Sequence, residues 1–211
     1  MNANKYYFGI LQNMKCYKVT NKRGYTKLQT KWGNGVSHTA KGDGDRLCSN
    51  GFIHFYRDPR LAVLMHCQYT SHLEDPILWE AQSSGNQIHR FFKSGAKKLT
   101  TIKRIPFPKI TKNQRIAIAI LCVKTLIGDC DFRFTQWADK WLSGEDRTKK
   151  TARLMELNFT IGDIEYNVIN AVTYYSYASS VSRVLGMFGV RVPFFKFKNL
   201  QKIIDEGMKI K

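Results

Sequence analysis

The fold of this chain is decided by the stretch Arg46-Leu-Cys-Ser-Asn-Gly-Phe-Ile-His-Phe-Tyr-Arg-Asp-Pro-Arg-Leu-Ala-Val-Leu-Met65. Asn50-Gly51 is a turn dipeptide, and the residues from Phe52 to Tyr56 are the aromatic and β-branched types that strands prefer. Asp58 suits the cap of a helix and Pro59 suits its first turn. The stretch therefore predicts a turn, a short strand and a helix in immediate succession.

Strand patterns also occur on both sides of this stretch. Side chains of alternating polarity or short apolar runs, bounded by turn residues, mark four more segments before Pro108. The predicted strands are 15–20, 25–32, 52–56, 77–81 and 97–106. Gly33–Gly44 has no periodicity and is predicted to be a surface loop, and Ser83–Asn86 is predicted to be a turn.

After Pro108 the sequence pattern becomes typical of helices. Thr111 is the expected cap of a helix whose apolar run, Ile116–Val123, indicates deep burial. Further helices are predicted at 134–142, from 145 or 146 to 157, from 163 to 185, and at 199–208, with a break at 186–193. The sequence thus predicts an α+β protein with an N-terminal appendage at 1–13, a small twisted β-sheet in 14–108 and a helical region in 109–211.

The chain of 211 residues carries 34 Lys and Arg against 16 Asp and Glu, a net charge of +18. Both halves are basic: residues 1–105 have 17 Lys and Arg against 6 acids, and residues 106–211 have 17 against 10. Such a field attracts polyanions, of which nucleic acid is the foremost, although the charge could also serve solubility alone. No run approaches the roughly 20 apolar residues of a membrane span, and Met1–Gln12 does not have the pattern of a signal peptide, so no membrane partner is expected.

Five cysteines are scattered without a Cys-x-x-Cys pair. An odd number at irregular spacing favours reduced thiols in a cytosol-like compartment, and it argues against a structural metal. The cysteines are Cys16, Cys48, Cys67, Cys122 and Cys130.

Three ionisable or polar side chains within predicted strands are candidate site residues. His54 and Tyr56 share one strand face, because side chains repeat every second residue. Glu80 lies in an apolar strand, where a carboxylate must be paired or face a site. For His54 the structural alternative is a satisfied hydrogen bond, and for Glu80 it is an ion pair with Lys or Arg.

The segment Trp32-Gly-Asn-Gly-Val-Ser-His38 places flexible backbone between an aromatic ring and an imidazole. Its glycines allow close approach to a phosphate or ribose. The segment is neither a P-loop nor a dinucleotide-binding fingerprint, because it lacks Gly-Lys-Ser/Thr and the third glycine. Trp32 and His38 are therefore candidate ligand contacts.

Three basic clusters, two of them beside aromatic residues, are candidate contacts to nucleic acid. The alternative is a solvated basic edge above core phenylalanines. The clusters are Lys93, Lys97, Lys98, Lys103 and Arg104; then Arg147, Lys149, Lys150 and Arg153; and finally Lys196, Lys198 and Lys202.

Ordered motifs over about two-thirds of the chain resemble a family of uncharacterised bacteriophage proteins. The motifs are Lys15-Cys-Tyr-Lys-Val-Thr20, Trp32-Gly-x-Gly-Val-x-His38, Leu47-Cys-Ser-x-Gly-x-Ile-His-x-Tyr56, Asp58-Pro-x-Leu-Ala62, Leu78-Trp-Glu80 and Trp137-Ala-x-Lys-Trp-Leu-Ser-Gly-Glu-Asp-Arg147. This resemblance implies a phage-encoded factor that acts in the host cell cytoplasm, in host takeover or against host defence.

The order of a strand, a Gly-rich loop, a Gly-x-Ile-His strand, a helix and a strand with an acid is similar to ADP-ribosyltransferase-like folds. That resemblance implies a split β-sheet that binds NAD, with Trp32, His38 and Tyr56 at the cofactor. It implies catalytic roles for His54 and Glu80. The chain departs from the pattern because it has no Glu-x-Glu pair and no clear Arg at the end of its first strand.

Two classes of function are favoured by the sequence, and a third, a capsid or scaffold-associated protein, is disfavoured because no long heptad or assembly arm appears. One is NAD-dependent ADP-ribosyl transfer to nucleic acid or to a host protein associated with nucleic acid. The other is non-enzymatic: a basic nucleic-acid-binding protein or an inhibitor of a host nucleic-acid enzyme. A titration with NAD and a salt-dependent binding assay distinguish them.

Overall fold

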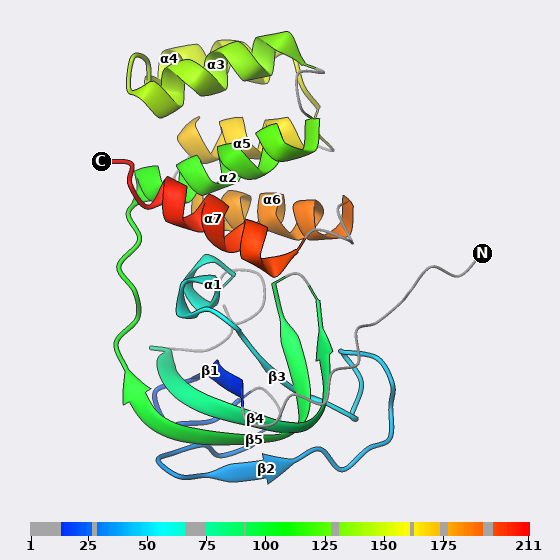
Figure 1. Ribbon diagram of the computed structural model, residues 1–211. Helices are drawn as coiled ribbons and strands as arrows, with labels where there is room; N and C mark the ends of the chain where they lie inside the picture. Colours follow the sequence, from blue (N-terminus) through cyan, green and yellow to red (C-terminus); the bar gives the residue numbers. More distant parts are fainter. Residues whose placement is uncertain are drawn as a thin grey trace, which may run out of the picture. The chain divides into compact units, whose positions relative to one another are not determined.

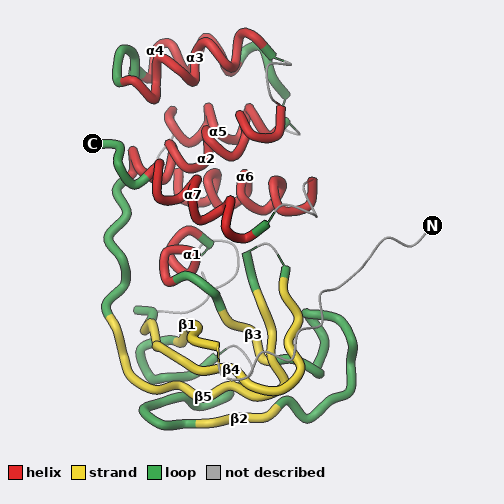
Figure 2. Tube along the Cα trace, viewed as in Figure 1, coloured by secondary structure: helices red, strands yellow, loops and turns green. Residues whose placement is uncertain are grey.

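A computed structural model describes residues 14–26, 29–65, 75–90, 92–127, 131–160, 163–173, 177–191 and 196–211. These residues form two compact units that divide between Pro108 and Lys109. The first unit contains an antiparallel sheet and the second is helical (Figures 1 and 2), so the predicted α+β class is confirmed.

The sheet of the first unit has the strand order β1-β4-β5-β2, and β3 also pairs with β5. All of its pairings are antiparallel. The elements are β1 (Met14–Thr20), β2 (Ser37–Thr39), β3 (Ile53–Phe55), α1 (Pro59–Leu64), β4 (Ile77–His89) and β5 (Ser94–Ile105). Figure 1 shows β4 and β5 as a long, strongly curved pair.

Three sequence predictions in this unit need correction. The predicted turn Ser83–Asn86 lies inside β4, where a bulge between Ser84 and Gln87 absorbs the irregularity. In the predicted strand 25–32, the described residues form only an isolated bridge between Tyr25 and Lys31. The predicted loop contains a short strand, β2, because it finds a free edge of β5. In all three places pairing partners, not local composition, decide the outcome.

The quoted stretch folds as the sequence predicts. Asp58 caps α1 by accepting a hydrogen bond from Arg60 N at 2.8 Å, and Pro59 occupies its first turn. The chain just after β3 returns to β1, because Tyr17 and Tyr56 exchange two backbone hydrogen bonds of 2.8 Å. This bridge brings the edge of β3 back to β1 around an apolar core of Cys16, Trp32, Phe55, Ala81, Ala96 and Leu99.

The second unit is built around α2, which contacts α5, α6 and α7. Its Ile116–Ile120 run is buried, as the uninterrupted apolar sequence predicts. The elements are α2 (Lys112–Ile127), α3 (Phe132–Ser143), α4 (Lys149–Glu156), α5 (Ile164–Thr173), α6 (Tyr177–Arg191) and α7 (Phe197–Gly207). Thr111 accepts a hydrogen bond from Gln114 N at 3.2 Å, which confirms it as the cap of α2.

Three helix predictions in this unit are wrong. The single helix expected from 163 to 185 is observed as two helices, α5 and α6, which pack against each other. The helix expected from 145 or 146 begins at Lys149, because Thr148 is its cap and Asp146 binds Thr148 N and the Thr151 hydroxyl outside it. The break expected at 186–193 does not begin at Gly186, which lies inside α6. Packing of α6 on α2 and α5 compensates for the low helix propensity of glycine there. None of the described helices is long and apolar enough to cross a membrane.

Candidate functional site

One side of the sheet in the first unit consists of polar and ionisable side chains in register. Directly paired residues point to the same side, so the register defines three rows across the strands. The rows are Ser84–Lys98–Thr39, Lys15–Gln82–Thr100–Ser37, and Tyr17–Glu80–Lys103. We call this side the polar face. The opposite side carries Cys16, Ala81 and Leu99 of the apolar core.

Lys15, Lys98 and Lys103 are exposed on the polar face. The Lys15 ammonium lies 3.0 Å from the Glu80 carboxylate, and the Thr100 hydroxyl donates to the Ser37 hydroxyl at 3.0 Å. The Lys15 side chain is 62% exposed, so its pair with Glu80 is a surface ion pair that water and salt weaken. Three lysines against one acid leave this face positively charged.

His54 is held by the backbone of the preceding loop. Its Nε2 donates to the Leu47 carbonyl, which assigns the proton to that nitrogen. Burial, reinforced by Lys93, lowers the pKa of His54 from its usual 6.5 to about 4. Gly95, directly opposite His54, has no room for a side chain: a Cβ there would lie 2.8 Å from Leu47 Cδ1. His54 is thus a neutral, half-buried imidazole whose side chain is hydrogen-bonded, as expected for a histidine with a structural role.

Tyr56 and Glu80 lie on either side of Tyr17, because both are paired with it directly. Tyr56 is 5% exposed, and the Glu80 side chain is 19% exposed. Alternation along the chain from His54 to Tyr56 puts His54 on this side as well. The three predicted residues therefore share one side of the sheet, although the described contacts of His54 and Glu80 are with Leu47 and Lys15.

Trp32 and His38 lie on the other side. Trp32 belongs to the apolar core at 2% exposure, and His38 is paired with Leu99 of that core. Their rings meet edge to face, with centroids 4.7 Å apart, and His38 Nε2 donates to the Lys31 carbonyl at 2.7 Å. These two residues and the set of His54, Tyr56 and Glu80 consequently do not line one common cleft for NAD.

Lys18 is a central residue that the sequence did not single out. Its ammonium donates to the His54 carbonyl at 2.7 Å and lies 5.3 Å from the centre of the Trp32 ring. Burial, followed by repulsion from Lys93, lowers its pKa from 10.5 to about 8. The available signal was its place in an alternating strand beside Cys16, where a lysine is out of pattern on a buried face.

The other predicted basic residues have varied environments. The Lys97 ammonium donates to the Gly42 carbonyl, so it contacts the loop between β2 and β3. Burial lowers the pKa of Lys93. Arg104 is exposed, and the register pairs it with Trp79. Six further cations of the second unit are exposed: Lys149, Lys150, Arg153, Lys196, Lys198 and Lys202.

Arg147 has an internal role. Its guanidinium donates to the carbonyls of Trp141 at 2.9 Å, Leu142 at 3.3 Å and Lys211 at 2.8 Å. It also lies over the Trp141 ring at 5.0 Å. The contacts to Trp141 and Leu142 satisfy carbonyls at the C-terminus of α3, which is capped by Gly144 in the left-handed conformation. The arginine is therefore occupied by the fold and is poorly placed to bind phosphate.

Within the described residues no group of His, Cys, Asp and Glu has the arrangement of a metal site. No protein family model, no curated protein and no solved structure matches the chain. The function is therefore inferred from the residues and their geometry.

Proposed function

We propose that the chain is a nucleic-acid-binding protein that uses the polar face of its sheet. The observation that carries this proposal is the register, which aligns Lys15, Lys98 and Lys103 with hydroxyl and amide side chains across four strands. Lysines attract phosphates, and hydroxyl and amide groups hydrogen-bond to phosphate and sugar oxygens. The charge of +18 supports the same proposal by raising the local concentration of polyanions.

The proposal is tested by binding of fluorescent single-stranded RNA, single-stranded DNA and duplex DNA across a range of salt concentrations. For the full chain we expect saturable binding that weakens steeply with salt. Each phosphate contact contributes about 0.7 to 0.9 to the logarithmic salt slope. The double variant Lys98→Ala/Lys103→Ala should lower that slope by roughly 1.5 and weaken binding in proportion.

A matched control is Lys109→Ala/Lys209→Ala, which removes two exposed lysines that belong to none of the candidate clusters. It should leave both affinity and slope close to those of the wild type. Equal losses in the control and the double variant would mean that binding follows total charge and not the polar face. No salt-dependent binding to any of the three probes would refute the proposal.

NAD-dependent ADP-ribosyl transfer is the competing proposal. Its support is that His54, Tyr56 and Glu80 share one side of the sheet. Of the residues expected at the cofactor, only Tyr56 lies on that side with the two catalytic candidates, because Trp32 and His38 belong to the apolar side. Calorimetric titration with NAD tests this proposal. A binding heat that is seen with the wild type and absent in a folded Glu80→Gln variant would favour the transferase, and the absence of any binding heat with the wild type would exclude it.

The resemblance to bacteriophage proteins suggests the setting of either activity. A nucleic-acid binder of this kind would act in the cytoplasm of an infected host, on host or phage nucleic acid or on the enzymes that process it. Expression of the chain in bacteria, followed by crosslinking and sequencing of bound nucleic acid, would identify that target. Loss of the crosslinked material in the Lys98→Ala/Lys103→Ala variant would tie it to the polar face.

A further inference from the structure

Helix α4 exposes two large aliphatic side chains on one of its faces. Leu154 is 59% exposed and Leu157, which caps the helix, is 84% exposed. Lys150 and Arg153 precede them at helical spacing, so the four residues at i, i+3, i+4 and i+7 form one stripe. The opposite side of α4 is buried through Ala152. We call Lys150, Arg153, Leu154 and Leu157 the α4 stripe.

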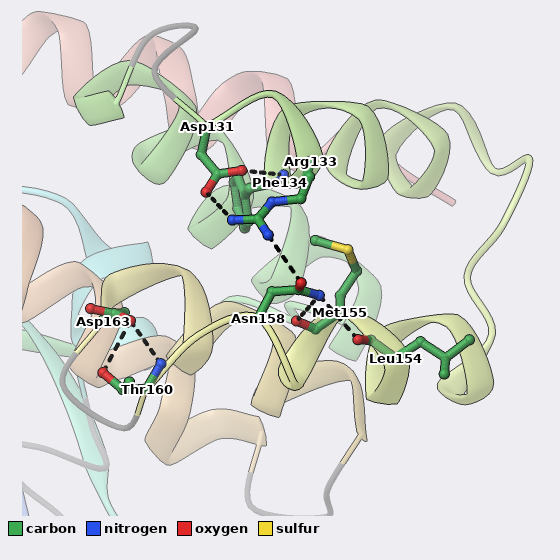
Figure 3. Close-up of polar contacts among 8 residues, drawn as sticks. All are labelled: Asp131, Arg133, Phe134, Leu154, Met155, Asn158, Thr160 and Asp163. Carbon is green, nitrogen blue, oxygen red and sulfur yellow. Dashed lines mark hydrogen bonds and ion pairs between the residues drawn. The ribbon is translucent and has the colours of Figure 1, made fainter.

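The C-terminal end of the stripe is held by a polar network (Figure 3). The Asn158 amide donates to the carbonyls of Leu154 at 3.2 Å and Met155 at 3.3 Å. Arg133 of α3 donates to the Asn158 side-chain carbonyl at 3.1 Å and pairs with Asp131 at 3.7 Å. Figure 3 shows the Leu154 side chain pointing away from this network. The exposed leucines thus lie at a helix end that is stabilised by hydrogen bonds and an ion pair.

The N-terminal end of α4 is fixed as well. The Thr148 hydroxyl accepts from Thr151 N at 3.3 Å, and Asp146 accepts from Thr148 N at 2.8 Å. Because both ends of α4 are anchored, the helix holds the side chains of the stripe in place. The two cations lie toward its N-terminus and the two leucines toward its C-terminus. A preorganised surface loses less entropy when a partner binds.

We propose that the α4 stripe is a docking surface for an acidic, amphipathic protein segment. Exposed leucines on an ordered helix favour an apolar partner, because aliphatic side chains neither pair with phosphates nor stack as aromatic rings do. Lys150 and Arg153 make the adjoining surface positive, and the stripe itself contains no acid. The complementary ligand is a helix with acidic residues beside leucine-like residues, laid against α4.

Other occupants fit this surface less well. An anionic membrane surface favours a longer helix with a wide apolar face, and α4 has eight residues and only this pair of exposed leucines. A second copy of the chain would bring together two molecules that each carry +18. Nucleic acid would use the cations and leave the leucines in water.

The test is a selection of random 16-residue peptides displayed against the full chain, with depletion on the Leu154→Ser/Leu157→Ser variant. The expected peptides combine Asp and Glu with Leu, Phe or Met at i, i+3 and i+4. Synthetic peptides from the selection, titrated by fluorescence anisotropy, should bind the double variant at least about tenfold more weakly. Lys150→Glu/Arg153→Glu should weaken binding by a similar factor, most strongly at low salt.

The matched control is Ile102→Ser, which removes an exposed apolar side chain from the other unit and should not change peptide affinity. Circular dichroism confirms that each variant is folded. A selection that yields no peptide dependent on the leucines, or one without acidic enrichment, overturns the proposal. So does leucine-dependent binding that is found only with phosphatidylglycerol vesicles, with a single-stranded oligonucleotide, or as self-association in sedimentation velocity.

Discussion

At the scale of single residues, the structure turns His54 from a candidate catalyst into a pH-sensitive part of the fold. Its pKa of about 4 means that the folded state binds a proton less readily than the unfolded chain, in which the usual value of 6.5 applies. Between these values the unfolded state holds more protons, so the free energy of unfolding falls as the pH falls. His89 acts in the same direction, because burial lowers its pKa to about 4 as well.

His54→Gln should therefore reduce the acid sensitivity of the first unit. Glutamine can still donate to the Leu47 carbonyl but does not titrate. His54 accounts for roughly 2 kcal/mol of the stability lost between pH 7 and pH 5, and the more exposed His89 for less, because solvent screens its interactions. Urea unfolding at the two pH values should show that the variant loses no more than about half as much as the wild type. An unchanged loss would mean that His54 is not buried in solution as it is in the structure.

Arg147→Lys tests the internal role of a residue that the sequence placed in a basic cluster. A lysine cannot reach the three carbonyls together, because it lacks the planar fork of the guanidinium. We expect a loss of about 1 to 3 kcal/mol in unfolding free energy and little change in nucleic-acid affinity. Lys149→Ala, an exposed neighbour, is the control for charge. A variant that is as stable as the wild type but binds more weakly would restore Arg147 to the interface.

At the scale of elements, close packing decides where helices can lie. Gly207 at the end of α7 faces α2 so closely that a Cβ would lie 2.4 Å from Ile118 Cγ1 and 3.0 Å from Ile118 N. The second of these atoms is backbone and cannot move aside on its own. The glycine is therefore a packing requirement of the α2 and α7 pair.

Gly207→Ala should cost about 1 to 3 kcal/mol through overpacking, despite the better helix propensity of alanine. The measurement is the urea midpoint followed by circular dichroism at 222 nm. Lys202→Ala, on the exposed side of the same helix, should stay within about 0.5 kcal/mol of the wild type. A stabilised Gly207→Ala variant would show that α7 packs less tightly on α2.

The elements also show which predictions local sequence can support. The start of α1 at Asp58-Pro59 and the cap of α2 at Thr111 were predictable, because a cap depends on residues within one turn. The strand inside 33–44 and the continuation of β4 through Ser83–Asn86 were not, because each depends on pairing with β5, far away in the chain. For the same reason the polar face could not be predicted, because its rows are defined by the register of the strands.

At the scale of the whole molecule, each unit has its own core and a buried thiol that reports on it. Burial raises the pKa of Cys16 in the first unit to about 12, and it raises the pKa of Cys122 in the second. Cys48 is exposed. In the folded protein, iodoacetamide should therefore modify Cys48 within minutes and leave Cys16 and Cys122 protected.

Pulsed alkylation in urea, followed by peptide mass spectrometry, should give a separate unfolding midpoint for each buried thiol. Lowering the pH from 7 to 5 should shift the Cys16 midpoint downward, because His54 and His89 belong to its unit. The Cys122 midpoint should move less. Identical shifts would mean that the two units unfold as one cooperative body.

Local sequence is enough to predict the α+β class, the change from strands to helices at Pro108, and the basic character of both halves. These features follow from periodicity, caps and composition, which are written locally. Tertiary structure was needed to learn that Lys18 meets Trp32, that Arg147 meets the C-terminus of α3, and that the lysines of the polar face share one side of the sheet. A one-residue change of register reverses the side on which a strand's residues lie, so such meetings depend on long-range pairing that no local pattern encodes.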